Sequence, residues 1–408
     1  MYFTRKLEDS FLKYNKEYKV LLLTGQRQSG KTTMLEHLIK KEGKKRTYIS
    51  LDTPNIRMLA KNDTENFFKI YKTPILIDEV QNVPELFPYI KSRVDKNKQN
   101  GEFWLTGSHV FKMMENVEES LAGRVCNMHM STLSLAEIYK YRGKEFTLDK
   151  DELLAKYRER ENHKTDSIYN DIYIGSMPAI VSKEKTDKNK YYEDYVSTYL
   201  DKDLRYIANK IDIFKFQSFI KILASYTAQV LNVNNLSQIS EINVKTINNY
   251  LNILERLGII FYLHSYSNNL LKRAITKPKL YFYDLGLITY LLDFESSNDV
   301  KKYNQFGALF ENYVVSEIMK SYLNASKTPH VYFYRDIDNK EIDVILESKG
   351  TLYPIEIKST STPSIKACSN FSVLNKSNKK IGTSAIICTS ENISSLGENN
   401  IVIPYFLI

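Results

Sequence analysis

The stretch GQRQSGKT, residues 25–32, constrains this chain more than any other part of its sequence. It matches the pattern G-x-x-x-x-G-K-[S/T], and it lies between the apolar run VLLLT and the helical pattern TTMLEHLIK. A glycine-rich loop between a strand and a helix directs backbone N–H groups and the positive end of the helix dipole toward phosphates. The pattern therefore predicts a nucleotide site in an α/β domain, where Lys31 reaches the β and γ phosphates and Thr32 holds Mg²⁺.

A second apolar run, TPILIDEV at residues 73–80, ends in the acidic pair Asp78 and Glu79. The carboxyl ends of parallel strands meet at one edge of a sheet, so this pair is expected beside the loop. Asp78 would bind Mg²⁺ through water, and Glu79 would orient or deprotonate the attacking water. A helix cap is the alternative role for such a pair. The residues expected to contact the nucleotide are Gly25, Gln26, Arg27, Gln28, Ser29, Gly30, Lys31, Thr32, Thr33 and Asp78.

Two further positions bear on hydrolysis. The strand FWLT has Thr106, Gly107 and Ser108 at its tip, where a hydroxyl would touch the γ phosphate or the water; an ordinary turn is the alternative. Arg124, in SLAGRV, would enter the site of a neighbouring subunit as an arginine finger, which requires a homo-oligomer. An arginine near a helix end is also a common C-cap.

These motifs recur together in a known group of proteins. With GQRQSGKTT, ILIDEVQ, WLTGS, SLAGRV, LSLAEI and IGSMPAI, the chain resembles the predicted AAA+ superfamily ATPases of archaea and bacteria. The resemblance continues through YLDKDLRYI, KPKLYFYDLGLITYLL, GALFENYV and FYRDIDNKEIDVIL, so it covers nearly the whole chain. It implies an ATPase core that uses ATP rather than GTP, a choice that the motif spacing alone does not make, fused to a C-terminal region of unassigned function.

The middle of the chain predicts a DNA-binding module. A short helix near LSQIS, a turn and a helix from about Val244 to Leu257 are followed by IIFYLHSY, with KPKLYFYD as a candidate hairpin partner. This order describes a winged helix, whose second helix would face a DNA groove while its wing lies near phosphates. Winged helices also bind proteins, so a protein partner is the alternative. The candidate DNA contacts are Lys245, Thr246, Asn248, Asn249, Asn252, Lys272, Arg273, Lys277 and Lys279.

A second charged set lies near the C-terminal end. In YPIEIKST, Glu356 and Lys358 share one face of a strand because strand side chains alternate; Asp343 lies on the preceding strand and Glu311 on a helix before it. This is the order of restriction-endonuclease-like folds, where Glu311, Asp343 and Glu356 would bind Mg²⁺ and Lys358 would activate water. Glu341 is an alternative ligand, and an exposed ion pair is the alternative role for Glu356 and Lys358.

The expected fold is an α/β multidomain chain with four parts. They are a parallel-sheet P-loop ATPase core at residues 1–140, a charged and helical connector at 141–215, a winged helix at 216–300, and a restriction-endonuclease-like α/β domain at 301–408. The charge of +9 favours an acidic partner such as DNA, although most lysines are scattered. Three distant cysteines and the lack of an apolar run of about 18 residues predict a cytoplasmic protein without a membrane segment.

Together these features predict ATP hydrolysis, with ATP and Mg²⁺ as cofactors, coupled to a C-terminal half that binds DNA and carries a nuclease-like module. Whether that module cleaves DNA stays open. The alternative is an ATP-gated switch for DNA or protein binding, with negligible turnover and an inactive nuclease-like fold.

Overall fold

The computed structural model divides the chain into two compact units. The first comprises Met1–Leu133 with the short stretches Arg256–Gly258 and Leu323–Lys327, and the second comprises Ser134–Glu255, Ile259–Tyr322 and Thr328–Ile408. The structure describes residues 2–43, 45–97, 99–107, 121–143, 145–185, 187–200, 212–267, 269 and 276–408. Across this described part of the chain, no helix has the length and apolar content needed to cross a bilayer.

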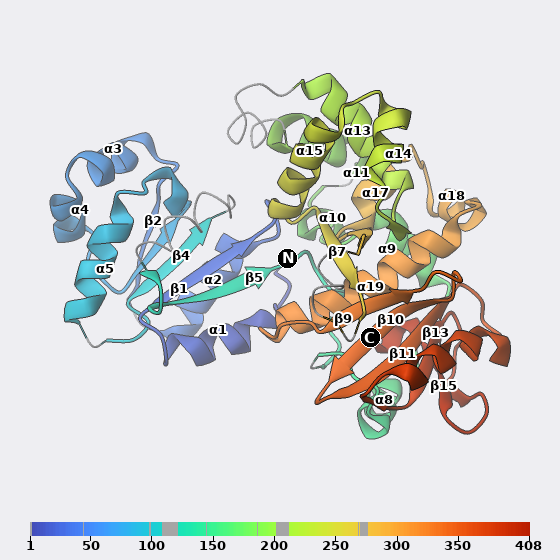
Figure 1. Ribbon diagram of the computed structural model, residues 1–408. Helices are drawn as coiled ribbons and strands as arrows, with labels where there is room; N and C mark the ends of the chain where they lie inside the picture. Colours follow the sequence, from blue (N-terminus) through green and yellow to red (C-terminus); the bar gives the residue numbers. More distant parts are fainter. Residues whose placement is uncertain are drawn as a thin grey trace. The chain divides into compact units, whose positions relative to one another are not determined.

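A five-stranded parallel sheet forms the centre of the first unit (Figure 1). Its strands are β1 (Val20–Gly25), β2 (Thr47–Ser50), β3 (Ile75–Asp78), β4 (Phe103–Gly107) and β5 (Val125–Met130). They lie in the order β2-β3-β4-β1-β5, so β4 separates the strand that leads into the P-loop from the strand that ends in Asp78. The predicted parallel-sheet core is confirmed.

Helices cover both faces of this sheet. They are α1 (Leu7–Asn15), α2 (Lys31–Glu42), α3 (Pro54–Asn62), α4 (Thr64–Ile70) and α5 (Leu86–Lys96), with a 3-10 turn η1 (Val80–Asn82). On β1, Val20 and Leu22 pack in the cluster that includes α3, α4 and α5, whereas Leu21 and Leu23 pack against α1 and α2. Burial on both faces explains why β1 reads as a continuous apolar run rather than an alternating one.

A ten-stranded mixed sheet runs through the second unit in the order β14-β15-β13-β11-β10-β9-β7-β8-β6, with β12 paired to β11. Its strands are β6 (Gln229–Val230), β7 (Ile260–Ser265), β8 (Lys279–Phe282), β9 (Val331–Arg335), β10 (Glu341–Ser348), β11 (Thr351–Lys358), β12 (Lys380–Ile381), β13 (Ser384–Cys388), β14 (Ser394–Ser395) and β15 (Asn400–Pro404). Because β7 pairs with β9, the sheet continues across the domain boundary expected at residue 300. The four expected domains stay a prediction.

The described part of the second unit also contains the following helices. They are α7 (Leu135–Ile138), α8 (Lys150–Glu159), α9 (Ser167–Ile174), α10 (Pro178–Val181), α11 (Lys188–Asp194), the π-helix η2 (Tyr195–Leu200), α13 (Ile213–Ser225), α14 (Val233–Ser240), α15 (Val244–Arg256), α17 (Leu285–Leu291), α18 (Ser297–Lys302), α19 (Phe306–Asn324), η3 (Ile365–Lys376) and η4 (Tyr405–Leu407). The predicted hairpin is confirmed, since β7 and β8 pair antiparallel. The winged-helix assignment stays a prediction, and Lys272 and Arg273 lie outside the described residues.

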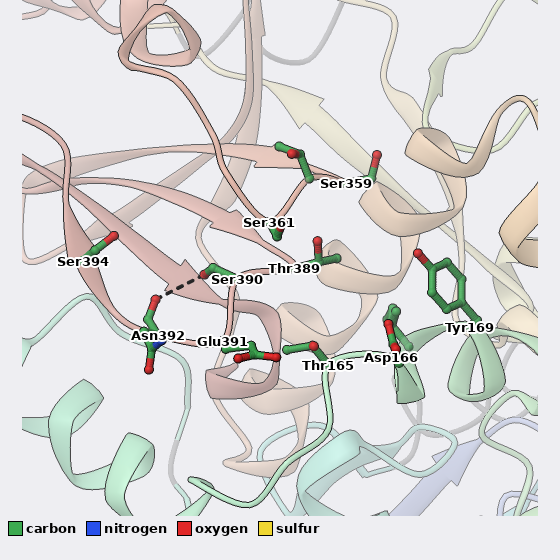
Figure 2. Close-up of a pocket in the computed structure, with 12 residues that line it drawn as sticks. Thr165, Asp166, Tyr169, Ser359, Ser361, Thr389, Ser390, Glu391, Asn392 and Ser394 are labelled. Carbon is green, nitrogen blue, oxygen red and sulfur yellow. Dashed lines mark hydrogen bonds between the residues drawn. The ribbon is translucent and has the colours of Figure 1, made fainter.

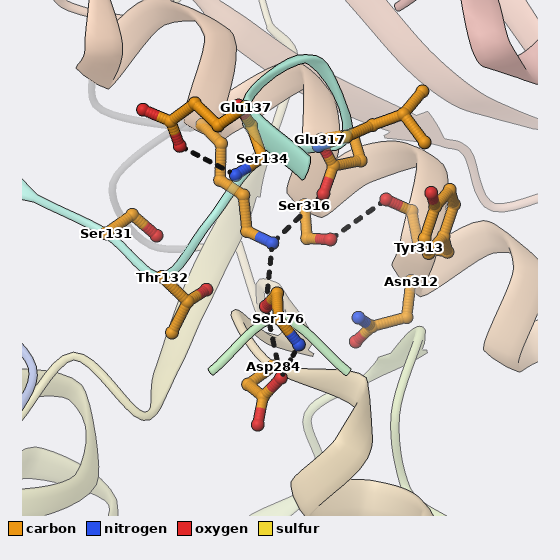
Figure 3. Close-up of polar contacts among 12 residues, drawn as sticks. Ser131, Thr132, Ser134, Glu137, Ser176, Asp284, Asn312, Tyr313, Ser316 and Glu317 are labelled. Carbon is orange, nitrogen blue, oxygen red and sulfur yellow. Dashed lines mark hydrogen bonds and ion pairs between the residues drawn. The ribbon is translucent and has the colours of Figure 1, made fainter. Parts of the chain in front are cut away.

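A buried polar network holds α19 to other segments of the second unit (Figure 3). The Lys320 ammonium, 1% exposed, donates to Ser176 Oγ at 3.1 Å and to Glu317 Oε1 at 3.0 Å. Asp284 accepts from the Ser176 backbone N–H at 2.7 Å and from the Tyr192 hydroxyl at 2.6 Å. Each of these groups has a partner, so the network stabilises the packing instead of leaving buried charges uncompensated.

Asn312 joins α19 to β8 in a similar way. Its fully buried amide accepts from Phe282 N at 2.8 Å and donates to Phe282 O at 2.9 Å, and it also accepts from the Thr227 hydroxyl at 2.5 Å. The side chain therefore satisfies both backbone groups of Phe282, the last residue of β8.

We predict that Asn312→Ala lowers the free energy of unfolding by about 2–3 kcal/mol, because it leaves buried backbone groups unpaired. Urea unfolding followed by circular dichroism measures this change. The exposed Asn304 is the matched control, and Asn304→Ala should change the value by less than about 0.5 kcal/mol. Equal effects of the two substitutions would contradict the role given to Asn312.

Candidate functional site

The P-loop leaves β1 through a glycine that no other residue can replace. Gly25 has φ 146°, and a Cβ there would lie 2.1 Å from the carbonyl oxygen of Met130, its partner on β5. Gln28 and Gly30 also have positive φ values, 60° and 91°. These positive-φ residues lie directly before α2, which begins at Lys31, so the loop leads straight into the helix N-terminus.

Lys31 is folded onto the loop that carries it. Its ammonium, in a side chain only 6% exposed, donates to the carbonyl oxygens of Gly25 at 3.0 Å and Gln26 at 2.9 Å. Ser29 is fully buried, and its hydroxyl has no hydrogen-bond partner among the described residues. An ammonium and an orphaned hydroxyl in a positive-φ loop fit a bound phosphate group.

Thr32 and Asp78 meet as the sequence predicted. The Thr32 hydroxyl lies 3.2 Å from each carboxylate oxygen of Asp78, and the Tyr48 hydroxyl donates to the same carboxylate at 3.4 Å. Burial, and then the neighbouring Glu79, raise the pKa of Asp78 to about 6. A hydroxyl and a carboxylate at this spacing are hard oxygen donors that fit Mg²⁺.

Glu79 follows Asp78 in a left-handed conformation, with φ 55° and ψ 46°. Gln81 Nε2 donates to its carboxylate, which holds the side chain beside the end of β3. Thr106 lies on β4 between the P-loop strand and β3; it is fully buried, and within the described residues its hydroxyl has no partner. Both residues therefore lie near the carboxyl ends of neighbouring strands, their roles in hydrolysis stay predictions, and Ser108 lies outside the described residues.

Three of the predicted contact residues are less enclosed than Lys31 and Ser29. Gln28 and Thr33 are exposed, and Arg27 is partly buried. Their proposed contacts with the nucleotide stay predictions.

Three residues near the loop had no signal in the sequence. Arg5, 3% exposed, donates to the carbonyl oxygens of Ser29 and Ser131 at 2.7 Å each, and so holds the P-loop to the segment after β5. His129 lies 3.4 Å from the Thr24 hydroxyl, and burial and the Lys31 charge lower its pKa to about 4. Tyr48 is the third. None belongs to a local motif, and only the strand pairing brings them together.

Arg124 lies at the far end of the sheet from the P-loop. It precedes β5, whose first residue pairs with Val20, whereas Gly25 pairs with Met130, so roughly 17 Å of strand separate them. Its guanidinium forms an ion pair with Asp95, with Nε–Oδ1 2.5 Å and Nη2–Oδ2 3.1 Å. Arg124 therefore cannot serve the nucleotide site of its own subunit, and its finger role stays a prediction for an oligomer.

The second unit brings the predicted carboxylates together around a lysine. The ammonium of Lys279, on β8, lies 2.9 Å from Glu311 Oε1, 2.5 Å from Glu341 Oε1 and 3.9 Å from Asp343 Oδ1. Burial alone would lower the pKa of Lys279, but the surrounding carboxylates raise it. Our expectation that Lys279 contacts DNA phosphates is wrong, because the side chain is 3% exposed and fully paired with acids.

Glu356 and Lys358 pair with each other beside this cluster. Lys358 Nζ lies 2.7 Å from Glu356 Oε1, and Asp343 Oδ2 accepts from the Ile357 backbone N–H at 2.8 Å. Burial, followed by the charge of Asp343, raises the pKa of Glu356 to about 7 and that of Glu311 to about 7. Within the described ranges, no three His, Cys, Asp or Glu side chains are gathered so as to hold a metal ion. The metal role of Glu311, Asp343 and Glu356 stays a prediction.

A pocket of about 740 Å³ opens beside Lys358, at the carboxyl ends of β11 and β13 (Figure 2). Hydroxyl groups such as those of Ser359, Thr360 and Thr389 line it, together with Asp166 and Glu391. The described lining residues include two carboxylates and no lysine or arginine, a charge that opposes a phosphate. We therefore assign no ligand to this pocket.

Three family models match separate parts of the chain. Residues 17–139 match an AAA domain, 165–298 match a domain of unknown function (DUF8612), and 306–408 match another domain of unknown function (DUF4143). Residues 17–139 thus form an AAA-type P-loop domain. This match covers Lys31, Thr32 and Asp78, so the cluster at the edge of the parallel sheet lies within the AAA domain, and its role in nucleotide binding stays a prediction.

Some proteins and solved structures are similar to this chain over more than one domain. Uncharacterized proteins of Mycobacterium tuberculosis and Mycobacterium bovis are each 26% identical over 386 residues, covering 94% of this chain and 80% of theirs. The Thermotoga maritima RuvB Holliday junction branch migration motor is 13% identical to this chain, with a TM-score of 0.30. The match covers 64% of this chain and 89% of the RuvB chain. AMPPCP-bound DnaA from Aquifex aeolicus is 16% identical, with coverages of 61% and 85% and a TM-score of 0.26. TM-scores at this level support no functional conclusion.

We predict that Lys31→Ala weakens ATP binding by about 10- to 100-fold, since hydrogen bonds to charged groups contribute about 1.5–3 kcal/mol. Calorimetric titration with ATP and Mg²⁺ measures the affinity. Lys40→Ala, on the exposed side of the same helix, is the matched control and should leave the affinity unchanged. An unaltered ATP affinity in Lys31→Ala would contradict the assignment of the loop.

Arg124 and its partner offer a second test. Arg124→Ala should lower ATP turnover of an oligomer by at least about tenfold, because arginine fingers contribute roughly 10³ to 10⁵ in rate. Asp95→Ala breaks the same ion pair but keeps the guanidinium, so it should retain turnover. If both substitutions have the same small effect in steady-state assays, the pair is structural and Arg124 is not a finger.

Proposed function

We propose that this protein is a Mg²⁺-dependent ATP hydrolase whose AAA-type domain acts on a DNA-binding C-terminal half. The observation that carries the proposal is the meeting of Thr32 with Asp78 beside Lys31, at the edge where Glu79 also lies. These are the groups needed to bind phosphates, hold a metal ion and orient water, and they lie in a domain that matches the AAA model.

The geometry suggests how the residues would act on ATP. Lys31 would exchange its two loop carbonyl partners for the β and γ phosphate oxygens, and the Ser29 hydroxyl and loop N–H groups would complete the cradle. Thr32 and Asp78 would hold Mg²⁺, which neutralises the charge that develops on the phosphates. Glu79 would orient the attacking water, and the unpaired Thr106 hydroxyl would contact that water or the γ phosphate.

The DNA part of the proposal rests on α14, α15 and the β7–β8 hairpin, which we propose to be a winged helix. Ile247, Tyr250 and Leu254 bury one face of α15. The opposite face is exposed, and its residues lie at helical spacing: Lys245, Asn248, Asn249 and Asn252. Such a face presents amide and ammonium groups that suit base edges and phosphates, and Lys277, exposed before β8, would add a phosphate contact.

For the C-terminal module we propose a nuclease-like fold. Support comes from α19 and from the hairpin β10–β11, followed by the parallel neighbour β13, with Asp343 and Glu356 on adjacent strands. The pairing of Lys279 with three of the acids favours a second candidate, an ATP-gated switch that holds DNA or a protein without cutting. We derive no cleavage step from this cluster, because its side chains face an ammonium.

Steady-state ATP hydrolysis with and without duplex DNA tests the proposal. We expect DNA to raise turnover, and we expect Glu79→Gln to keep ATP binding while losing about 10²- to 10⁴-fold in turnover, the range for one general base. Glu85→Gln, at an exposed neighbour, is the control. Negligible turnover together with nucleotide-dependent DNA affinity would favour the switch. Both candidate functions would be contradicted if Glu79→Gln left turnover unchanged and the nucleotide left DNA affinity unchanged.

A further inference from the structure

The acidic cluster of the second unit is built around a cation that belongs to the chain itself. Lys279 places its ammonium within 2.5–3.9 Å of carboxylate oxygens of Glu311, Glu341 and Asp343. The Tyr281 hydroxyl, two residues along β8, donates to the same Glu311 oxygen at 2.7 Å. Strand β8 thus supplies the hydrogen-bond donors for a cluster whose acids come from α19 and β10.

One carboxylate of the cluster stays open. Glu356 is 7% exposed, its Oε1 pairs with Lys358, and its Oε2 is buried with no partner in the described part of the chain. A buried carboxylate oxygen without a donor is costly, so it marks a place where a further positive group would be stabilised. The local charges agree, because within the described part of the chain the four acids Glu311, Glu341, Asp343 and Glu356 pair with two lysines, Lys279 and Lys358, and Arg335 lies near Glu341.

An ammonium and a divalent cation compete for such oxygens. Mg²⁺ needs oxygen ligands at about 2.0–2.1 Å in an octahedral arrangement, whereas the acids here are spread around a hydrogen-bonding ammonium. A divalent ion beside a buried ammonium would also meet strong repulsion at low dielectric. The two cations therefore exclude one another from the cluster.

We propose that Lys279 is an internal cation that closes this cluster, and that a divalent metal ion binds Glu311, Asp343 and Glu356 only after Lys279 is withdrawn. The inference rests on the proposed nuclease-like role of these three acids. Its new element is that the Lys279 ammonium, carried by β8, blocks the site.

The position of Lys279 ties this block to the predicted wing. Lys279 is the first residue of β8, and its strand partners are Val230 on β6 and Leu263 on β7. Because both neighbouring strands hold β8, the ammonium can leave the cluster only through a movement of this strand or of the Lys279 side chain.

The test measures Mn²⁺ binding by electron paramagnetic resonance on the full chain without nucleotide. Every variant carries Asp78→Asn, so that the P-loop site adds nothing. In this background we compare Lys279→Met with Lys277→Met, which removes an exposed lysine two residues away and leaves the cluster intact. We expect Lys279→Met to bind one Mn²⁺ at least about tenfold more tightly than the background or Lys277→Met, equivalent to about 1.4 kcal/mol.

Adding Glu356→Gln to Lys279→Met should abolish the gained binding, because it removes the open oxygen. If Lys279→Met alone does not fold, Lys279→Met with Glu341→Gln reduces the uncompensated charge and keeps the three proposed ligands. Glu341 is the most exposed of the four acids, with a side chain 29% exposed, and it is not one of the three proposed ligands. It is therefore the acid whose neutralisation should disturb the cluster least.

The failures are distinguishable. The Asp78→Asn background and Lys279→Met could bind Mn²⁺ with equal affinity, and Glu356→Gln could abolish that binding. This result would overturn the block by Lys279 while leaving the proposed metal role of the acids in place. No Mn²⁺ binding in either Lys279→Met or its Glu341→Gln partner would overturn both. Gained affinity that survives Glu356→Gln would also overturn the proposal, since the ion would then lie elsewhere.

Discussion

The carboxyl ends of five parallel strands meet at one edge of the first unit's sheet, and the proposed nucleotide site depends on that constraint. The P-loop follows β1, Asp78 ends β3, and Thr106 lies near the end of β4 between them. The hydrogen bonds from Thr32 to Asp78 join the start of α2 to the end of β3. Groups from separate segments are thus held together by the fold, which lowers the ordering cost of binding.

The second unit depends on a different constraint, the pairing of buried charges across its packed elements. Lys279 of β8 pairs with Glu311 of α19 and Glu341 of β10, and so joins three separate elements, whereas Lys320 and Glu317 pair within α19. Removing one member of such a pair leaves an uncompensated charge, so these contacts fix which elements pack together. This also explains why a cluster of acids in the right order for a metal site can instead be occupied by an ammonium.

The sequence was informative where the chemistry is local. The P-loop is one contiguous motif, Asp78 follows an unbroken apolar run, and the α15 boundaries and the β7–β8 hairpin follow from periodicity and Gly258. Long-range contacts were not predictable. Lys277 and Lys279 look alike in the sequence, yet Lys277 is exposed and Lys279 is buried. The burial of Lys279 depends on its pairing with Glu311 of α19, which lies 32 residues further along the chain and is not part of any local pattern. Arg5 and Tyr48 likewise gain their roles only when the strands pair, and no local pattern marks them.

A crystal structure of the protein with Mg²⁺ and a non-hydrolysable ATP analogue would show directly whether residues 25–32 bind the nucleotide. The account predicts that the Lys31 ammonium leaves the carbonyl oxygens of Gly25 and Gln26 for the β and γ phosphates. It also predicts that the Thr32 hydroxyl contacts Mg²⁺ and that Glu79 faces a water in line with the γ phosphate. A nucleotide bound away from residues 25–32, or a Lys31 that keeps its loop carbonyl partners in the complex, would contradict it.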